Sequence, residues 1–202
     1  WGHPAFRTSQ EEIINSLLEG KDTLAILPTG GGKSVCFQVP ALILEGCCLV
    51  ISPLIALMED QVQRLQEMDI PAMAIMSGMG YQDTENALDA CMNDALKFLY
   101  VSPERLETRA FRDRLLSLPI TLIAVDEAHC ISQWGYDFRP SYLHIAKIRE
   151  YLPRIPVIAL TASATGKVKE DIADKLIMKN PSIFMTSFAS KNLRYDAEKC
   201  DD

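Results

Sequence analysis

Short apolar runs alternate with amphipathic stretches along the whole chain. Seven runs of five residues are mostly apolar and do not alternate strictly with polar residues, which is typical of strands buried on both faces of a sheet. These predicted strands are 23–27, 48–52, 72–76, 97–101, 121–125, 157–161 and 183–187.

The stretches between these runs carry apolar residues at helical spacing. The first begins at Ser9, whose distance from Glu12 fits a capping box, and continues with apolar side chains on one face. Further helices are predicted over 33–44, 54–68, 82–95, 108–117, 141–152 and 166–178. Strands that alternate with helices imply right-handed crossovers, so we expect an α/β domain with a mostly parallel central sheet and helices on both faces. Ligands bind beyond the carboxyl ends of such strands.

Composition and length fit one globular domain of 202 residues, with 48% hydrophobic and 23% charged residues. No apolar run approaches the roughly 20 residues that span a bilayer. No signal peptide is visible, so we expect no membrane partner and a cytoplasmic location. Because the chain begins at Trp1, we expect it to be a fragment. The six cysteines form no C-x-x-C pair, which favours buried reduced thiols over a zinc site or disulfides.

The net charge of −7 argues against a simple nucleic-acid-binding module, because such modules usually carry a basic face. Any contact with nucleic acid must therefore use local groups or the basic surface of another domain.

A glycine-rich loop follows the first predicted strand. It reads Pro28, Thr29, Gly30, Gly31, Gly32, Lys33 and Ser34. Glycines let successive backbone N–H groups curl around phosphate oxygens, while Lys33 would reach the terminal phosphates and Ser34 would ligate Mg²⁺. Leu27 stands where the common P-loop pattern has glycine, but the strand-loop-helix context is kept. The alternative is a glycine-rich turn with a solvent-facing lysine.

Two adjacent carboxylates follow the fifth predicted strand. Asp126 would hold Mg²⁺ through its water, and Glu127 would orient and deprotonate the attacking water. The alternative is a solvated helix start, where acids are favoured by the helix dipole. His129 would either transmit the nucleotide state to a neighbour or hydrogen-bond locally.

Three alternating aromatics follow the carboxylates: Trp134, Tyr136 and Phe138. Gly135 and Pro140 disfavour a long strand, so we expect an exposed loop whose rings offer a flat ligand a surface for stacking. The alternatives are a short strand that packs one aromatic face into the core, and a domain contact.

Other polar groups after strands are candidates for contacts with DNA. Ser52 and Ser102 each precede a proline, and their hydroxyls and the neighbouring amides would hold DNA phosphates. A helix start with serine as the cap is the alternative, and both readings can hold together. Arg139 would pair with a phosphate, with Asp137 or with the carboxylate pair.

These motifs resemble the first motor domain of RecQ-family DNA helicases, within helicase superfamily 2. The resemblance covers essentially the whole chain through ordered motifs. They are FRTSQ (6–10), PTGGGKS (28–34), SPLIALMEDQV (52–62), YVSPERL (100–106), DEAHCISQWGYDFRP (126–140) and LTASAT (160–165). The run from 126 to 140 is the most family-specific of these.

The resemblance implies a RecA-like domain that binds ATP and Mg²⁺ and acts with a second RecA-like domain on single-stranded and forked DNA, in the 3′ to 5′ direction. It assigns adenine binding to Gln10, with Arg7 holding the nucleotide and His3 at the place of an adenine-stacking aromatic. It makes the loop that contains Gln133 and the aromatics the element that couples DNA contact to hydrolysis. Thr161 and Ser163 would connect the nucleotide site to domain closure.

The same resemblance divides the chain into a first RecA-like domain over 1–186 and the start of a second over 187–202. Ala189, Ser190 and Lys191 replace the family's usual Asp-Arg-Pro there, and Tyr136 stands where many relatives have histidine. No second P-loop domain or trans-acting arginine finger is visible, so we expect this chain alone to hydrolyse ATP slowly and not to unwind duplex.

Two other classes of function remain open at this point. A P-loop ATPase that moves no nucleic acid would lack stimulation by DNA, although FRTSQ and the aromatic loop speak against it. A non-catalytic nucleotide-binding module would be expected to have lost its base, and Glu127 is retained.

Overall fold

The structure, a computed structural model, describes residue 2, residues 4–135 and residues 137–186. Seven strands form one sheet in the order β3-β4-β2-β5-β6-β1-β7, and all neighbouring strands are parallel. The strands are β1 (Thr23–Ile26), β2 (Cys47–Ile51), β3 (Ala72–Ile75), β4 (Phe98–Val101), β5 (Ile120–Val125), β6 (Val157–Thr161) and β7 (Ser182–Met185). Each strand overlaps a predicted apolar run, which confirms the expected α/β class with a parallel sheet.

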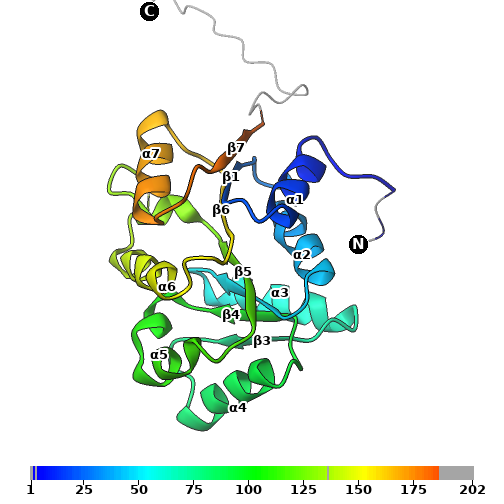
Figure 1. Cartoon of the computed structure of the whole chain (residues 1–202), viewed down its shortest axis with the longest axis vertical. Helices are drawn as coiled ribbons and strands as arrows, with labels where there is room; N and C mark the ends of the chain where they lie inside the picture. The colour runs from blue at the N-terminus through cyan, green and yellow to red at the C-terminus, as the bar shows by residue number, and fades with distance from the viewer. Residues whose placement is uncertain (1, 3, 136, 187–202) are drawn as a thin grey trace, which may run out of the picture.

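Helices cover both faces of the sheet (Figure 1). They are α1 (Gln10–Leu18), α2 (Lys33–Ile43), α3 (Ile55–Glu67), α4 (Tyr81–Met92), α5 (Arg109–Leu115), α6 (Ile145–Tyr151) and α7 (Gly166–Lys175), with 3-10 turns η1 (Pro103–Glu107), η2 (Ala128–Ile131) and η3 (Pro140–His144). The first three helices share one apolar core with the sheet, and α4 to α7 share the other. The predicted helix over 141–152 begins as η3 and continues as α6.

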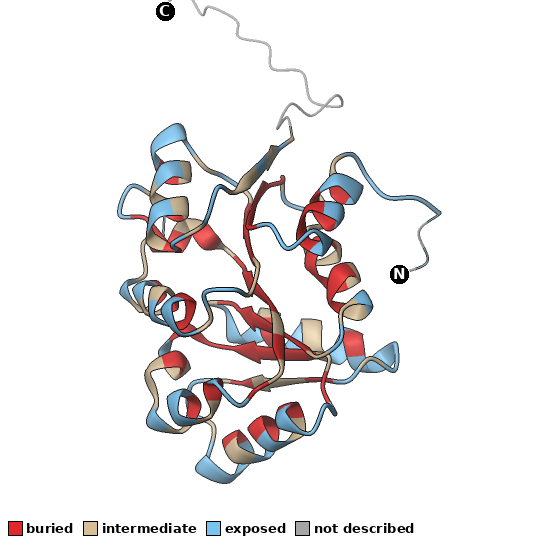
Figure 2. Ribbon diagram, in the orientation of Figure 1, coloured by how far each residue is buried: buried red, intermediate tan, exposed pale blue. Residues whose placement is uncertain are grey.

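Burial on both faces explains why the strands lack polar alternation (Figure 2). In β1, Leu24 and Ile26 join one core while Ala25, between them, joins the other. The edge strand β7 has neighbours on one side only, and its residues alternate between partly buried and exposed. The strand interiors therefore supply a rigid frame, and the loops at the carboxyl ends are free to carry chemistry.

The predicted capping box at the start of α1 is wrong. Ser9 has a left-handed backbone (φ 67°), and its side chain makes no capping hydrogen bond. A capping side chain needs an extended backbone to reach the first free N–H groups of the helix. Gln10, the first residue of α1, instead fixes the segment before the helix, because its side-chain oxygen accepts a hydrogen bond from the Arg7 amide at 2.8 Å.

Five cysteines within the described ranges are free and buried, which confirms that prediction for Cys36, Cys47, Cys48, Cys91 and Cys130, while Cys200 lies outside those ranges. None of the helices in the described part of the chain is both long and apolar enough to cross a membrane.

Candidate active site

The glycine-rich loop connects β1 to α2 at the carboxyl edge of the sheet. Gly30 and Gly32 have positive φ angles of 74° and 76°, which a side chain would strain. A Cβ on Gly31 would lie 2.8 Å from the Pro28 carbonyl oxygen, so the turn also needs close backbone approach. Gly32 precedes the first turn of α2, whose N–H groups face the loop. The geometry is that of an anion-binding loop at a helix N-terminus.

Two side chains from the start of the chain brace this loop. The Gln10 amide nitrogen donates to the Gly32 carbonyl oxygen at 3.1 Å, and the Arg7 guanidinium donates to the Gly30 carbonyl oxygen. Gln10 is only 4% exposed, so its amide is committed to the loop in this conformation. A hydrogen bond from Gln10 to adenine would need one of these contacts to be exchanged.

A cavity of about 560 Å³ lies beside the braced loop. Its walls come from the N-terminal segment, Gln10, Gly32 and one face of α2, where Val35 and Val39 contribute apolar surface. Phe6 also lines the cavity and is about half exposed. The volume and mostly apolar lining suit a flat heterocycle. His3, at the expected place for a stacking group, lies outside the described residues.

The first carboxylate of the pair is buried where β5 ends. Asp126 is 7% exposed, and one of its oxygens accepts a hydrogen bond from the Glu127 amide at 3.0 Å. Tyr142 fixes the backbone here by donating its hydroxyl to the Asp126 carbonyl oxygen at 2.8 Å. Burial and the neighbouring Glu127 raise the pKa of Asp126 to about 6. Among the described residues no cation pairs with this carboxylate.

Lys33 and Glu127 bring the two motifs together. The Lys33 ammonium nitrogen lies 3.7 Å from one Glu127 oxygen, and His129 Nδ1 lies 3.3 Å from the other. The hydrogen bond from His129 and the charge of Lys33 hold the pKa of Glu127 below its usual value. The Lys33 side chain is only 16% exposed, so the alternative of a solvent-facing lysine is wrong. A helix does start at the carboxylate pair, because η2 follows Glu127 directly, but the buried Asp126 shows that this start is not fully solvated.

His129 extends the network to the next strand end. Its Nδ1 lies 3.0 Å from the Thr161 hydroxyl, which in turn donates to the Ser163 carbonyl oxygen at 3.0 Å. Contacts with the Cys130 sulfur and with Glu127 raise the pKa of His129 to about 9. Thr161 is fully buried at the end of β6, whereas Ser163 is exposed in the segment that leads to α7. A continuous path therefore runs from Lys33 to the start of α7.

The donor set fits a hydrated divalent cation. No group of three or more His, Cys, Asp or Glu side chains in the described ranges could hold a metal ion by itself. Mg²⁺ usually takes one or two protein oxygens and completes its shell with water and substrate phosphates. Asp126 supplies a buried carboxylate without a cation, and Ser34 supplies a half-buried hydroxyl at the start of α2.

The aromatic loop, residues 132–139, contains no strand or helix in its described part, and Tyr136 lies outside that part. Trp134 is 62% exposed, so the alternative of an aromatic strand packed into the core is wrong for this residue. Gln133 is exposed and Phe138 is partly buried. A Cβ on Gly135 would lie 2.5 Å from the His129 carbonyl oxygen, so the loop passes close to the segment that carries His129.

Arg139 joins the aromatic loop to the segment that follows β2. Its guanidinium bonds to one Asp137 oxygen at 2.9 and 3.0 Å and to the Pro53 carbonyl oxygen at 3.0 Å. Of the partners predicted for Arg139, the structure shows Asp137 and not the carboxylate pair.

Ser52 and Ser102 lie side by side where the paired strands β2 and β4 end. Both side chains are buried, and their hydroxyl oxygens have no hydrogen-bond partner within the described structure. Neither hydroxyl caps a helix, because α3 begins at Ile55 after Leu54 and Ser102 makes no capping bond ahead of η1. The proposed phosphate contacts at these loops would therefore fall first to exposed backbone groups.

Two sets of residues were not predicted from the sequence. Val35, Val39 and Phe6 line the cavity beside the glycine-rich loop; Phe6 belongs to the FRTSQ motif, and only their proximity to the loop could have indicated the two valines. The α7 residues that contact the aromatic loop were also missed, although Lys167, Asp171 and Lys175 recur at intervals of four, which places them on one helix face.

The fold is a parallel α/β domain, and its candidate site combines a glycine-rich loop with a carboxylate pair. Comparison with known proteins identifies the class of protein to which this combination belongs. The profile of the DEAD/DEAH box helicase family matches residues 7–172, and the chain belongs to this family.

Similar curated proteins include RecQ helicases, which confirms the resemblance seen in the motifs. The chain is 43% identical over 195 residues to "ATP-dependent DNA helicase RecQ" of Pasteurella multocida, covering 96% of this chain and 31% of that protein. It is 44% identical over 201 residues to the protein of the same name from Bacillus subtilis, covering 98% of this chain and 34% of that protein. The chain thus spans about a third of the length of these relatives.

Solved helicase structures share the fold. A DUF1998 helicase MrfA bound to DNA superposes with a TM-score of 0.71 at 17% identity, over 91% of this chain and 27% of that chain. The Mycobacterium smegmatis helicase Lhr bound to single-stranded DNA and AMP-PNP superposes with a TM-score of 0.70 at 20% identity, over 92% and 26%. These similarities establish a RecA-like fold.

Proposed function

We propose that this chain is the first RecA-like motor domain of a RecQ-type DNA helicase, which couples hydrolysis of Mg-ATP to movement on single-stranded DNA and to duplex unwinding. The observation that carries the proposal is the network from Lys33 through Glu127 and His129 to Thr161. The network joins the glycine-rich loop to His129, whose segment leads into the aromatic loop, and to the end of β6. A motor needs such a connection to couple ATP hydrolysis to contact with DNA.

The nucleotide half of the proposal assigns roles by position. The glycine-rich loop and Lys33 hold the phosphates, with Pro28 and Thr29 shaping the entry to the loop. Ser34 and Asp126 hold Mg²⁺, which when bound neutralises charge on the transferred phosphoryl group. Bound phosphates would compete with Glu127 for the Lys33 ammonium. Once Lys33 turned to the phosphates, the Glu127 carboxylate would be free to orient water.

The DNA half of the proposal rests on the exposed Trp134 ring and on Arg139, which joins its loop to the one after β2. An aromatic ring stacks any base, so an acidic domain can bind single-stranded DNA without a basic face. Relatives named ATP-dependent DNA helicases and a similar fold bound to single-stranded DNA support the same ligand. Gln133, Phe138 and Ser163 are assigned to this surface as DNA-facing or coupling groups. Because the Ser52 and Ser102 side chains are buried, the backbone amides of the loops that follow them are the proposed phosphate contacts.

The remaining groups are proposed to come from the parent chain. Residues 1–186 form the first motor domain and 187–202 begin the second, which supplies the trans-acting charge for hydrolysis. Forked DNA and 3′ to 5′ movement follow from the RecQ type. This chain alone is then expected to hydrolyse ATP slowly and not to unwind DNA.

The deciding experiment is ATP hydrolysis by the parent protein with and without single-stranded DNA, for wild type and for Trp134→Ala. Stacking contributes about 1–3 kcal/mol per base, so we expect Trp134→Ala to raise the half-saturating DNA concentration about tenfold and to leave the DNA-independent rate unchanged. Tyr81→Ala is the matched control, because Tyr81 is an exposed aromatic on α4. Equal wild-type rates with and without DNA would instead favour a P-loop ATPase that moves no nucleic acid.

A further inference from the structure

Three side chains on one face of α7 contact the aromatic loop and Ile131, the residue before it. Lys167, Asp171 and Lys175 recur every fourth residue and all point to the segment 131–134. We call these three side chains the α7 clasp. None of the roles assigned above involves the clasp.

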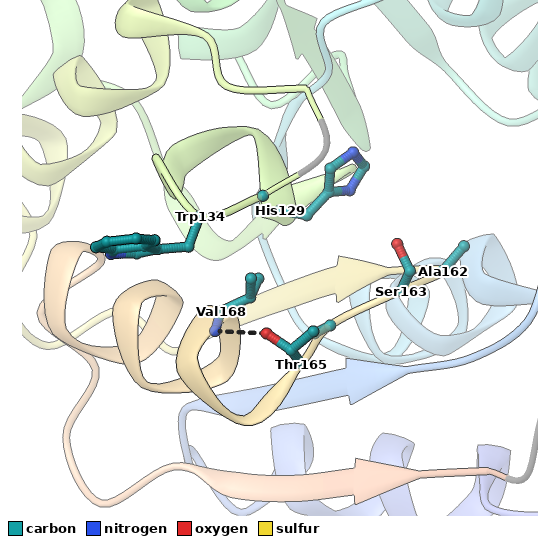
Figure 3. A pocket seen from close by; sticks show the side chains of 8 residues that line it. His129, Trp134, Ala162, Ser163, Thr165 and Val168 are labelled. Atoms are coloured by element: carbon teal, nitrogen blue, oxygen red, sulfur yellow. Dashed lines mark hydrogen bonds between the residues drawn. The ribbon is translucent and has the colours of Figure 1, made fainter.

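Lys167 lies over the Trp134 ring, on which DNA bases are proposed to stack. Its ammonium nitrogen lies 3.2 Å from the centre of the Trp134 ring. At this distance the cation is attracted by the negative face of the indole. One face of the exposed Trp134 ring therefore lies against a protein cation. Figure 3 shows the indole lying across α7, beside the cavity of about 510 Å³ that His129 and Ser163 also line.

Asp171 fixes the backbone of the same segment. The fully buried Ser132 donates its hydroxyl to an Asp171 oxygen at 2.6 Å, and the Trp134 amide donates to the Ser132 hydroxyl at 3.2 Å. The short bond to a carboxylate is of the charge-assisted kind. Lys175 closes the set, because it pairs with Asp171 at 3.2 Å and donates to the Ile131 carbonyl oxygen at 3.3 Å.

The helix that carries the clasp is itself connected to the nucleotide site. Thr165 caps α7 by accepting a hydrogen bond from the Val168 amide, and the segment before it runs back to Thr161 and His129.

We propose that Lys167, Asp171 and Lys175 are positioning residues that hold the aromatic loop in a docked state, which single-stranded DNA must displace before a base can stack on the covered face of Trp134. The inference rests on the proposed function, because DNA is the ligand of the released loop. A ligand that binds only the released state has its apparent affinity reduced by the fraction of molecules in that state. Weakening the clasp therefore lowers the DNA concentration that the motor needs.

The kinetic test uses the parent protein with Asp171→Ala and the control Asp174→Ala, which removes the same charge from an exposed position on the same helix. Loss of a hydrogen bond to a charged group shifts an equilibrium by about tenfold or more, so we expect Asp171→Ala to lower the half-saturating concentration of a single-stranded oligonucleotide about tenfold relative to Asp174→Ala. The rate at saturating DNA stays within about twofold. Ser132→Ala should have the same effect, and the double variant should add little to it.

A second readout needs neither ATP nor DNA. The chain contains two tryptophans, so Trp1→Phe leaves Trp134 as the single tryptophan of the 202 residues. We expect Lys167→Ala and Asp171→Ala to increase acrylamide quenching of its fluorescence, Lys167→Arg to restore the wild-type value, and Lys169→Ala to have no effect. Arginine also stacks on aromatic faces.

The outcomes separate the two proposals. If DNA does not change wild-type ATP hydrolysis while quenching rises in Lys167→Ala and Asp171→Ala, the clasp is supported and the proposed function is contradicted. Unchanged quenching in Lys167→Ala and Asp171→Ala overturns the clasp, whatever the hydrolysis rates. A lower rate at saturating DNA, with an unchanged half-saturating concentration, also overturns it, since the contact would then belong to the active state.

Discussion

Two buried carboxylates at opposite edges of the same sheet have opposite surroundings. Asp22 lies just before β1, at the amino edge, and is 4% exposed. Its oxygens accept hydrogen bonds from the Arg149 guanidinium at 2.6 Å and from the Val157 and Lys179 amides at 2.9 and 2.7 Å. The chain itself therefore supplies this buried carboxylate with a cationic partner and two further hydrogen-bond donors.

Asp126, which follows β5 at the carboxyl edge, is equally buried but incompletely bonded. It accepts one hydrogen bond from a neighbouring amide, and burial raises its pKa. A buried charge without a partner costs free energy, whereas a buried charge with full bonding can be tolerated. The amino edge is therefore built for stability, and the carboxyl edge carries an unmet charge that suits a bound cation.

The largest expected effect comes from the carboxyl edge. In the parent protein, Glu127→Gln should lower DNA-stimulated ATP turnover by about 10²–10⁴-fold, because general base catalysis typically contributes that much. Binding of a fluorescent ATP analogue and the Tm should stay close to wild type. Glu59→Gln, at an exposed position on α3, controls for the change in charge. Turnover that stays within tenfold of wild type would show that Glu127 is not the base.

The amino edge should respond in the opposite way. Asp22→Ala leaves the buried Arg149 charge without its carboxylate and two amides unpaired, so we expect a loss of about 3–5 kcal/mol in the free energy of unfolding. Urea unfolding of the chain measures this, with Asp174→Ala expected within about 0.5 kcal/mol of wild type. Hydrolysis per folded parent molecule should be unchanged. A similar stability for both variants would remove the contrast between the edges.

The sequence predicted most of the frame, and it singled out the glycine-rich loop and the carboxylate pair, which the structure brings together through Lys33 and Glu127. Strands buried on both faces leave an unambiguous apolar signature, and the spacing in the glycine-rich loop follows from backbone contact with phosphate. The Asp22–Arg149 pair was beyond reach, because its members are 127 positions apart and no local pattern links them. The clasp on α7 and the brace of Gln10 on Gly32 were missed for the same reason. Ser9 misled because its hydroxyl fits a cap only if its backbone is extended, and the chain turns left-handed there.

The smallest expected effect is also the sharpest test of the comparison. Asp126→Asn keeps the shape of the side chain and the hydrogen bond from the Glu127 amide, but it removes the unpaired charge. The pKa of Asp126 is raised to about 6, so its carboxyl is less easily ionised in the folded state than in the unfolded chain. At pH 7 the ionised form therefore destabilises the fold, and the variant should be more stable than wild type by about 1–3 kcal/mol without ligand.

Mg-ATP should reverse this order. A ligand that binds only the folded state stabilises it in proportion to the logarithm of its concentration over Kd, so wild type should gain stability that Asp126→Asn does not. Urea unfolding at pH 7, with and without Mg-ATP, measures both effects on one pair of proteins. If Asp126→Asn were less stable than wild type without ligand, Asp126 would be a structural carboxylate like Asp22. The buried carboxylates at the two edges of the sheet would then both stabilise the fold, and the contrast between the edges would be lost.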